Sequence, residues 1–364
     1  MKAIVEKFST RFLTVPYDEP VKHAYLGERT KHALLVLRVH TSDGCVGNSY
    51  IAIENDLQIR AVEGIIRSLE PQVRGLDALR RELIYNRLWG LTVDLLHDGA
   101  TNLAIAAIDI ALWDICGKMA RLPVWKMLGG ARDKVPVYAS QSLWRHQDVA
   151  RIEKEGAKLV EAGHKAMKLR LGGRPMHEDV ERARALRRVV GPDVTILTDA
   201  LWGFRPAEAL QLAERLEEFN IGWFEEPVRE GDWEGLARVR DRCKLPLAGG
   251  ERISRVTDLP RMLPLVDHLI LDVTHIGGIT PWLQAATIAG ARNLPISAHV
   301  QHEFNIQLLA AIPTGQWIEY TPRREVLFRD LPKPVNGYIQ LSDAPGLGLE
   351  FDEAALDRHA TRGL

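Results

Sequence analysis

The sequence contains few cysteines, no excess of charge of either sign and no long hydrophobic run. Its three cysteines, Cys45, Cys116 and Cys243, are an odd number and lie far apart among 364 residues. They provide neither a disulfide framework nor a cysteine pair for a metal. The formal net charge is −1 and no long basic block is present, so we expect no nucleic-acid partner.

A segment that would direct the chain to a membrane is also missing. Charges at Lys2, Glu6, Lys7 and Arg11 interrupt any hydrophobic segment near the start of the sequence. No uncharged run approaches the roughly 20 apolar residues that a membrane-spanning helix needs. We therefore expect a cytoplasmic protein with no membrane partner, and a reducing compartment agrees with the unpaired cysteines.

The composition that is present is typical of a folded enzyme with a large core. Hydrophobic residues make up 46% of the chain and charged residues 26%. The length suits one α/β barrel of about 200–250 residues together with a smaller domain. Two domains are therefore the expectation.

The first third of the sequence predicts an α+β unit, residues 1–125. Two β-rich runs surround Thr41-Ser42-Asp43-Gly44, a turn sequence that favours an antiparallel hairpin. From Leu57 to about Lys118 the hydrophobic spacing becomes helical. Strands followed by helices in this order indicate an α+β arrangement.

Residues 126–325 alternate short apolar strands with amphipathic helices, the pattern of a (β/α)8 barrel. Continuous apolar strands are expected where helices cover a parallel sheet. We predict a final segment, 326–364, that returns to the first domain. The eight expected strands are Val135–Ser140, Ala166–Leu171, Val194–Ala200, Gly222–Glu226, Pro246–Glu251, His268–Val273, Pro295–Val300 and Gln316–Tyr320.

Three acidic residues end consecutive predicted strands at steps of 26 residues, namely Asp199, Glu225 and Glu251. The carboxyl ends of barrel strands form the active-site face, so these side chains should meet. Clustered carboxylates repel one another unless a cation joins them, and an all-oxygen ligand set with room for water and substrate favours Mg²⁺. We predict one Mg²⁺ per subunit, against the alternative of surface salt bridges or helix caps.

The next two strands end in a candidate base. Asp272 ends the sixth strand and His299 the seventh, so the two side chains should be neighbours. A carboxylate beside a histidine fixes its tautomer and raises its basicity, which suits a general base with a pKa near neutral pH. A structural histidine with an ordinary hydrogen bond is the competing interpretation.

Further charged side chains are expected on the second and eighth strands. Lys168 and Arg170 alternate with Leu169 and therefore share one face, where two inward cations need anionic ligands. Lys168 could hold a substrate carboxylate, and Arg170 can donate hydrogen bonds but stays protonated. Glu319 ends the eighth strand and could assist an enolate oxygen if it is protonated or hydrogen-bonded. Solvated cations and a rim salt bridge are the alternatives.

Taken in order, these residues resemble the enolase superfamily and its mandelate racemase subgroup, over nearly the whole chain. The resemblance implies a capping domain that closes over the barrel and selects the substrate. It also implies a Mg²⁺ that binds a substrate carboxylate and stabilises the enediolate. The fragments that carry the resemblance are residues 107–118, Leu128-Gly-Gly, Lys168-Leu-Arg170, Trp223-Phe-Glu-Glu-Pro227, Gly250-Glu251, Asp272, Ile276-Gly-Gly-Ile-Thr280, His299 and Trp317-Ile-Glu319.

Two positions depart from the pattern of the family. Arg170 replaces the second lysine of Lys-x-Lys, and Leu201 stands where the family commonly has a polar side chain. A racemase exchanges protons on both faces of one carbon, and an arginine is a poor base for that task. A dehydratase can use His299 alone, first to abstract the α-proton and then to help expel a β-hydroxyl. We therefore predict a sugar-acid dehydratase, a lyase that yields a 2-keto-3-deoxy acid.

Two other functions stay open at this point. The chain could be a racemase or epimerase of a 2-hydroxy acid with Lys168 as second base, or a catalytically silent barrel that binds a metal and an acid. Its expected partner is a small carboxylate, and the resemblance suggests a symmetric homo-oligomer. The candidate substrate contacts are His23, Trp144, Arg145 and Trp202, for each of which packing is the alternative.

Overall fold

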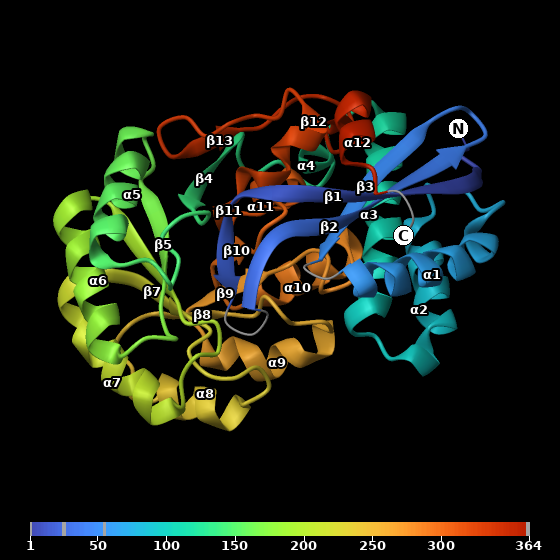
Figure 1. Cartoon of the computed structure of the whole chain (residues 1–364). Helices are drawn as coiled ribbons and strands as arrows, with labels where there is room; N and C mark the ends of the chain where they lie inside the picture. Colours follow the sequence, from blue (N-terminus) through green and yellow to red (C-terminus); the bar gives the residue numbers. More distant parts are fainter. Residues whose placement is uncertain (1, 24–26, 54–55, 362–364) are drawn as a thin grey trace.

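A computed structural model describes residues 2–23, 27–53 and 56–361. The chain begins with an antiparallel sheet in the order β1 (Val5–His23), β2 (Gly27–Thr41) and β3 (Val46–Ile53). The predicted turn joins β2 to β3, and Gly44 adopts a φ of 83°, which favours glycine. The long β1–β2 hairpin extends beyond the helices that pack on this sheet and reaches toward the barrel (Figure 1).

Helices cover one face of this sheet. The covering helices are α1 (Asp56–Val73) and α3 (Gly99–Ala120). Helices α2 (Arg81–Leu91) and α4 (Val124–Met127) pack against α3, and η1 (Val93–Leu95) contacts α2. Side chains are buried all along residues 101–117 of α3, because this helix packs against β3, α1 and the barrel helix α10 (Ile279–Gly290). Gly47 permits the close approach of β3, since a Cβ there would lie 2.1 Å from the carbonyl oxygen of Ala111.

Eight parallel strands form a closed barrel, which confirms the predicted fold. Each strand pairs with the next, and the last pairs with the first through Ile318 opposite Val137. The strands are β4 (Lys134–Ala139), β5 (Ala166–Arg170), β6 (Thr195–Asp199), β7 (Ile221–Glu225), β8 (Leu247–Gly249), β9 (His268–Leu271), β10 (Ile296–Ala298) and β11 (Gly315–Tyr320). Buried side chains such as Tyr138, Leu197, Trp223 and Ile270 form a separate cluster among these strands.

Helical segments follow the strands and surround the barrel (Figure 1). Several begin at a side-chain cap. Asp148 accepts a hydrogen bond from the backbone N–H of Arg151, and Asp232 accepts one from Gly235. Besides α10 they are α5 (Val149–Glu161), α6 (Met176–Val190), α7 (Pro206–Leu216), η2 (Glu217–Phe219), α8 (Trp233–Arg240), η3 (Val256–Asp258), α9 (Leu259–Met262), η4 (Leu263–Leu265) and α11 (His302–Ala311).

The C-terminal segment contacts both parts of the molecule. It contains η5 (Pro322–Leu327), β12 (Phe328–Arg329), β13 (Tyr338–Gln340), β14 (Glu350–Phe351) and α12 (Glu353–His359). Strand β13 pairs antiparallel with β4 of the barrel, whereas Asp357 of α12 forms an ion pair with Arg11 of β1. The return to the first domain therefore involves α12, and the boundaries at 125 and 325 stay predictions.

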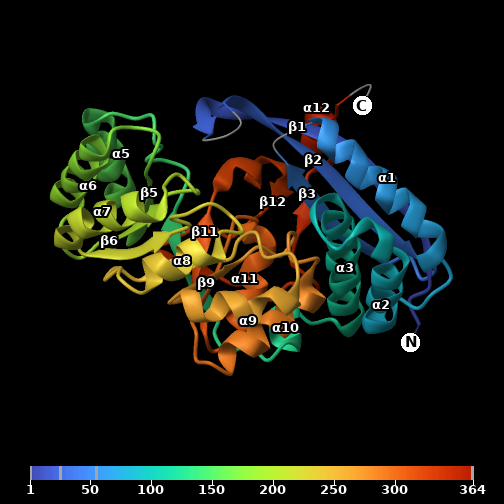
Figure 2. The same cartoon turned by 90° about the horizontal axis from the view of Figure 1, so that it is seen from below.

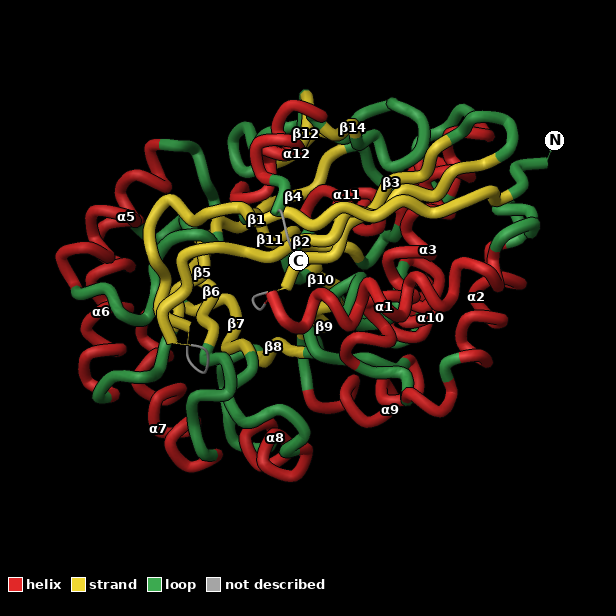
Figure 3. Tube along the Cα trace, turned by 45° about the vertical axis from the view of Figure 1, so that its right-hand side comes forward, coloured by secondary structure: helices red, strands yellow, loops and turns green. Residues whose placement is uncertain are grey.

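The sheet reaches over the mouth of the barrel. The strands β1 and β2 cross above the barrel strands in the tube view (Figure 3), and the far end of the hairpin approaches β5 and α5 (Figure 2). Glu19 of β1 pairs with Arg151 of α5 at 3.0 Å. No helix in the described part of the chain is long and apolar enough to cross a membrane.

Candidate active site

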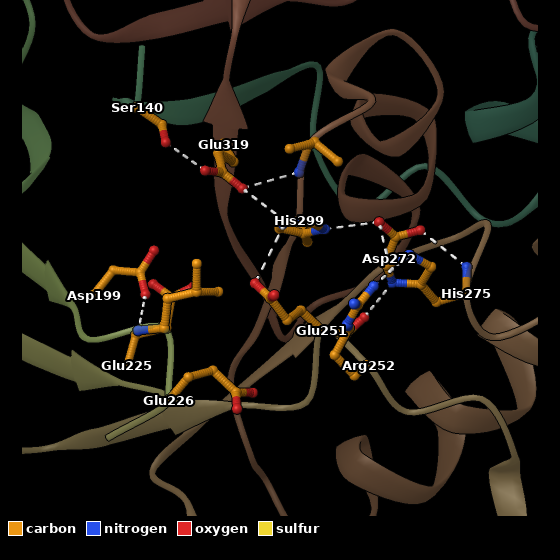
Figure 4. A network of polar contacts seen from close by, with 12 residues as sticks. Ser140, Asp199, Glu225, Glu226, Glu251, Arg252, Asp272, His275, His299 and Glu319 are labelled. Carbon is orange, nitrogen blue, oxygen red and sulfur yellow. Dashed lines mark hydrogen bonds and ion pairs between the residues drawn. The ribbon is translucent and has the colours of Figure 1, made fainter. Parts of the chain in front are cut away.

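Asp199 and Glu225 end adjacent strands and lie opposite each other in the β6–β7 ladder. Glu251 follows β8 by two residues. The parallel register brings these strand ends to one side of the barrel, where the three carboxylates are 4%, 0% and 6% exposed. Figure 4 shows Asp199 and Glu225 together, with Glu251 extending from the next strand toward His299. The trio expected from the 26-residue spacing thus comes from three neighbouring strands.

The ammonium group of Lys168 lies among buried carboxylates. Its Nζ is 3.1 Å from Glu225 Oε1, 3.3 Å from Asp199 Oδ2 and 3.1 Å from Glu319 Oε1. Burial alone would lower the pKa of Lys168, but the carboxylates of Glu225, Glu319 and Asp199 raise it well above its ordinary value. Lys168 is therefore a cation in this arrangement, and a metal ion held by Asp199 and Glu225 would oppose part of this shift.

One lysine does not balance the buried negative charge. Burial raises the pKa of Glu225 well above its ordinary value, and the nearby Asp199 and Glu251 raise it further. The oxygen-only donor set is the kind that Mg²⁺ prefers. The surplus of carboxylates and the donor chemistry of Asp199, Glu225 and Glu251 therefore both fit a divalent cation.

His299 lies between Asp272 on one side and the carboxylates of Glu251 and Glu319 on the other. Its Nδ1 is 2.7 Å from Asp272 Oδ2, while its Nε2 is 3.4 Å from Glu251 Oε2 and 3.9 Å from Glu319 Oε2. Figure 4 shows Glu319 and Glu251 on opposite sides of the imidazole. The structure thus brings together the Asp–His pair that the sequence predicted.

The pKa of His299 differs from the near-neutral value expected of the base. Burial lowers it, but the charges of Glu251, Glu319 and Asp272 and the hydrogen bond to Asp272 raise it to about 10. A cation held by Glu251 would oppose part of this shift, because like charges disfavour protonation. Without a cation on Glu251, the surrounding carboxylates therefore favour the protonated, imidazolium form of His299.

A second group of metal-ligand types lies close by. One ligand atom from each of Asp272, His275 and His299 falls within 4.8 Å of the others. However, Asp272 Oδ1 already accepts hydrogen bonds from the backbone N–H groups of Thr274 and His275 and from the Thr274 hydroxyl. Such a saturated carboxylate is better suited to orient His299 than to hold an additional ion.

Glu319 and Arg170 meet at Ser140, a residue that sequence reasoning missed. The Ser140 hydroxyl donates to Glu319, and Arg170 donates to the carbonyl oxygen of Ser140 at 2.6 Å and to its Oγ at 2.9 Å. Burial would raise the pKa of Glu319, but Lys168, His299 and Arg170 hold it well below its ordinary value. Of the two conditions expected for Glu319, protonated or hydrogen-bonded, the second is present, because its carboxylate accepts from the Ser140 hydroxyl and from the backbone N–H of Val300.

Glu226 is a second residue that the sequence did not single out. Its carboxylate accepts hydrogen bonds from the Trp202 indole at 2.9 Å and from the backbone of Gly250 at 2.8 Å. Burial, together with the charge of Glu251, raises its pKa to about 7. In the sequence, Glu226 is marked only as a second acidic residue directly after Glu225. Because side chains alternate along a strand, Glu226 is expected to point away from the face that carries Glu225.

The substrate contacts predicted from the sequence lie in different surroundings. Trp144 packs against Arg170, whose guanidinium carbon is 4.0 Å from the indole centre. Arg145 is buried beside Gly173 and acts electrostatically on Asp179 of α6. The side chain of His23 lies outside the described residues, so for all these positions a substrate contact stays a prediction.

Leu201 and Trp202 form a strained turn that begins two residues after Asp199. Their φ angles are 39° and 60°, in the left-handed region that non-glycine residues rarely adopt. The backbone N–H of Leu201 donates to Asp199 Oδ1 at 2.9 Å, and the turn carries the Trp202 indole to Glu226. The turn therefore orients Asp199 through the backbone of Leu201.

Comparison with known proteins agrees with this geometry. The enolase C-terminal domain-like family matches residues 132–355, and the mandelate racemase / muconate lactonizing enzyme N-terminal domain matches residues 8–129. These two matches together span most of the chain. The protein is therefore an enzyme of the enolase superfamily and belongs to its mandelate racemase / muconate lactonizing enzyme family.

Its relatives include enzymes with different reactions. A 3,6-anhydro-alpha-L-galactonate cycloisomerase of Streptomyces coelicolor is 29% identical, covering 98% of this chain and 99% of that protein. An L-talarate/galactarate dehydratase of Salmonella typhimurium is 28% identical, covering 96% and 89%. The crystal structure of that dehydratase with Mg and L-lyxarohydroxamate has a TM-score of 0.94 at 25% identity and covers 99% of this chain and 94% of its own.

Proposed function

We propose that this enzyme is a Mg²⁺-dependent dehydratase of a sugar acid and that it forms a 2-keto-3-deoxy acid. The observation that carries the proposal is the placement of His299 at one oxygen of Glu319 and of Lys168, with Asp199 and Glu225, at the other. Names of several relatives, among them the talarate/galactarate dehydratase, support this reaction class.

Asp199, Glu225 and Glu251 are the residues that would hold Mg²⁺. When bound, the ion would neutralise the second negative charge that develops on the substrate carboxylate during proton removal. Lys168 adds a fixed positive charge beside Asp199 and Glu225. It can therefore orient an anionic substrate oxygen at the same place.

His299 performs both proton transfers in this proposal. Its Nε2 accepts the α-proton, and the electron pair of the C–H bond moves into the carboxylate. The electron pair then forms the C2–C3 double bond as the C3–O bond breaks, and protonated His299 returns its proton to the departing hydroxyl. Water and an enol result, and the enol becomes the 2-keto acid by tautomerisation. Asp272 holds Nδ1 throughout, which keeps Nε2 directed into the site.

The racemase or epimerase alternative would need a second base. Lys168 is the candidate, but its ammonium group is already engaged by the carboxylates of Asp199, Glu225 and Glu319. Arg170 is bound to Ser140, and a guanidinium stays protonated. The environment of both cations thus favours the dehydratase over the racemase.

A library of aldonic and aldaric acids tests the proposal. With Mg²⁺ present, we expect a 2-keto acid, detected as its semicarbazone, together with loss of one water in the mass of the product. Since two relatives are named cycloisomerases, the assay must also follow lactones and products of unchanged mass. Inversion or isomerisation without any keto acid would contradict the dehydratase proposal.

A further inference from the structure

His275 lies between two residues of the candidate site that come from neighbouring loops. Its Nδ1 is 2.7 Å from the backbone carbonyl oxygen of Glu251, and its backbone N–H donates to Asp272 Oδ1 at 3.0 Å. Its ring also stacks on that of His299, with the ring centres 6.0 Å apart. Figure 4 shows His275 and Arg252 beside Asp272. One residue therefore contacts a proposed metal ligand and both members of the Asp–His pair.

The partners of the two ring nitrogens define the tautomer of His275. A carbonyl oxygen only accepts hydrogen bonds, so Nδ1 must carry the proton that is donated to Glu251. The other nitrogen, Nε2, is 3.3 Å from Arg252 NH1, and a guanidinium only donates. Nε2 therefore accepts, and His275 is a neutral imidazole with its proton on Nδ1. Both ring nitrogens are engaged in this arrangement, which suits a positioning role better than the binding of a metal ion.

Glu251 depends on such a contact because it lies outside the barrel strand. The other two proposed metal ligands are the last residues of β6 and β7, whereas β8 ends two residues before Glu251. Gly250 has a φ of 114°, in a region that residues with side chains rarely adopt. The chain then turns, and the backbone N–H of Ile253 donates to the carbonyl oxygen of Gly250 at 3.0 Å. The ring of His275 therefore holds the peptide group of Glu251 within a turn rather than a strand.

We propose that His275 is a positioning residue that holds Glu251 and Asp272 in a fixed relation and so aligns the proposed metal ligand with the base. The ring fixes Glu251 through its carbonyl oxygen, and the backbone N–H fixes Asp272, which in turn orients His299. This inference rests on the proposed function for the roles of Glu251 and His299. Hydrogen-bond partners behind metal ligands commonly contribute about 10- to 100-fold to metal affinity or activity, so removal of the ring should weaken Mg²⁺ binding.

Two measurements without turnover test this role. Nitrogen-15 NMR of the histidine rings should show His275 as the neutral form protonated on Nδ1, with its signals assigned by their loss in His275→Asn. Calorimetry should give a Mg²⁺ Kd about 10-fold weaker in His275→Ala than in the wild type. His275→Asn places an amide donor near the position of Nδ1, so it should restore the Mg²⁺ Kd to within about threefold of the wild-type value.

His359 of α12 provides a matched control, because its Nδ1 also lies 3.2 Å from a backbone carbonyl oxygen, that of Thr14. His359→Ala should leave the Mg²⁺ Kd within about threefold of the wild-type value, and melting temperatures in EDTA show whether each variant is folded. A wild-type Mg²⁺ Kd in His275→Ala would overturn the proposal.

Equal weakening of Mg²⁺ binding in His275→Ala and His275→Asn, or a His275 ring protonated on Nε2, would also overturn the proposal. Weaker Mg²⁺ binding in His275→Ala that His275→Asn restores, together with no keto acid from the wild type, would retain the positioning role and reject the dehydratase.

Discussion

Nδ1 of His299 lies 2.7 Å from Oδ2 of Asp272, and the two residues follow adjacent strands of the barrel. The remaining oxygen of Asp272 is fixed by Thr274 and the backbone N–H of His275. A carboxylate held this firmly sets the direction of the imidazole. The Nε2 atom consequently faces the region between Glu251 and Glu319, where the proposed reaction would place the α-carbon of the substrate.

Asp272→Asn should test whether the negative charge beside His299 supports its action as a base. The amide oxygen can still accept from Thr274 and His275, so the fold should persist. Loss of the negative charge should lower kcat by about 10²- to 10⁴-fold, the range of a general acid–base contribution. Steady-state kinetics with circular dichroism checks this. A kcat within threefold of the wild type would remove Asp272 from the mechanism.

Removal of one proposed metal ligand should abolish stabilisation by Mg²⁺. We expect Mg²⁺ at 100 times its Kd to stabilise the wild type by about 2.7 kcal/mol, seen as a higher melting temperature than in EDTA. Glu225→Gln should lose most of this difference, whereas Glu230→Gln, outside the trio, should keep it. An unchanged Mg²⁺ effect in Glu225→Gln would show that the ion binds elsewhere.

Arg170 should limit proton exchange to one face of the α-carbon. Its guanidinium is bound to Ser140 and packed on Trp144, and it cannot serve as a base. In D₂O the wild type should therefore not invert the configuration of a slow or unreactive 2-hydroxy acid. Arg170→Lys introduces an amine and should allow measurable exchange on the opposite face, seen by proton NMR. Inversion by the wild type would favour the racemase.

A buried carboxylate at the interface between helix α3 and the barrel predicts that the stability of the fold depends on pH. Asp109 of α3 accepts hydrogen bonds from the backbone and the hydroxyl of Thr280 at the start of α10. Burial raises its pKa from 3.8 to about 6. Between these values the folded protein binds more protons than the unfolded chain, so the unfolding free energy falls as pH rises.

The variant Asp109→Asn removes this dependence, because the amide does not titrate. Urea unfolding at pH 4, 5, 6 and 7 should show that the wild type loses stability relative to the variant as pH rises. The loss should reach up to roughly 3 kcal/mol, which corresponds to a shift of about two pKa units. The comparison cancels the contributions of other groups. A constant difference between the two proteins across this range would contradict the raised pKa.

The parts of the structure that repeat along the chain were predictable from the sequence. The eight strands and the equal spacing of Asp199, Glu225 and Glu251 follow from one βα unit per step, so each strand end could be located by counting. The hairpin at Gly44 followed from local turn chemistry. The positions of Asp272 and His299 followed from the same counting, and the family comparison supports the barrel that carries them.

Contacts between distant segments could not be predicted in the same way. Ser140 links Arg170 to Glu319 because the barrel closes between its first and last strands, and Asp109 reaches Thr280 across 171 residues. The near-neutral pKa expected for His299 also ignored the charges of Glu251 and Glu319. These features depend on side chains brought together by closure of the barrel, for which the local sequence carries no signal.

Removal of the α-proton by His299 is the central claim, and isotope exchange tests it most directly. The enzyme would be incubated in D₂O with Mg²⁺ and the sugar acid found in the library screen, with deuterium followed by NMR and mass spectrometry. In the wild type we expect one α-proton to be lost for each molecule of keto acid formed, and we expect neither change in His299→Asn or in EDTA. Exchange or product formation at the wild-type rate in His299→Asn would contradict proton removal by His299.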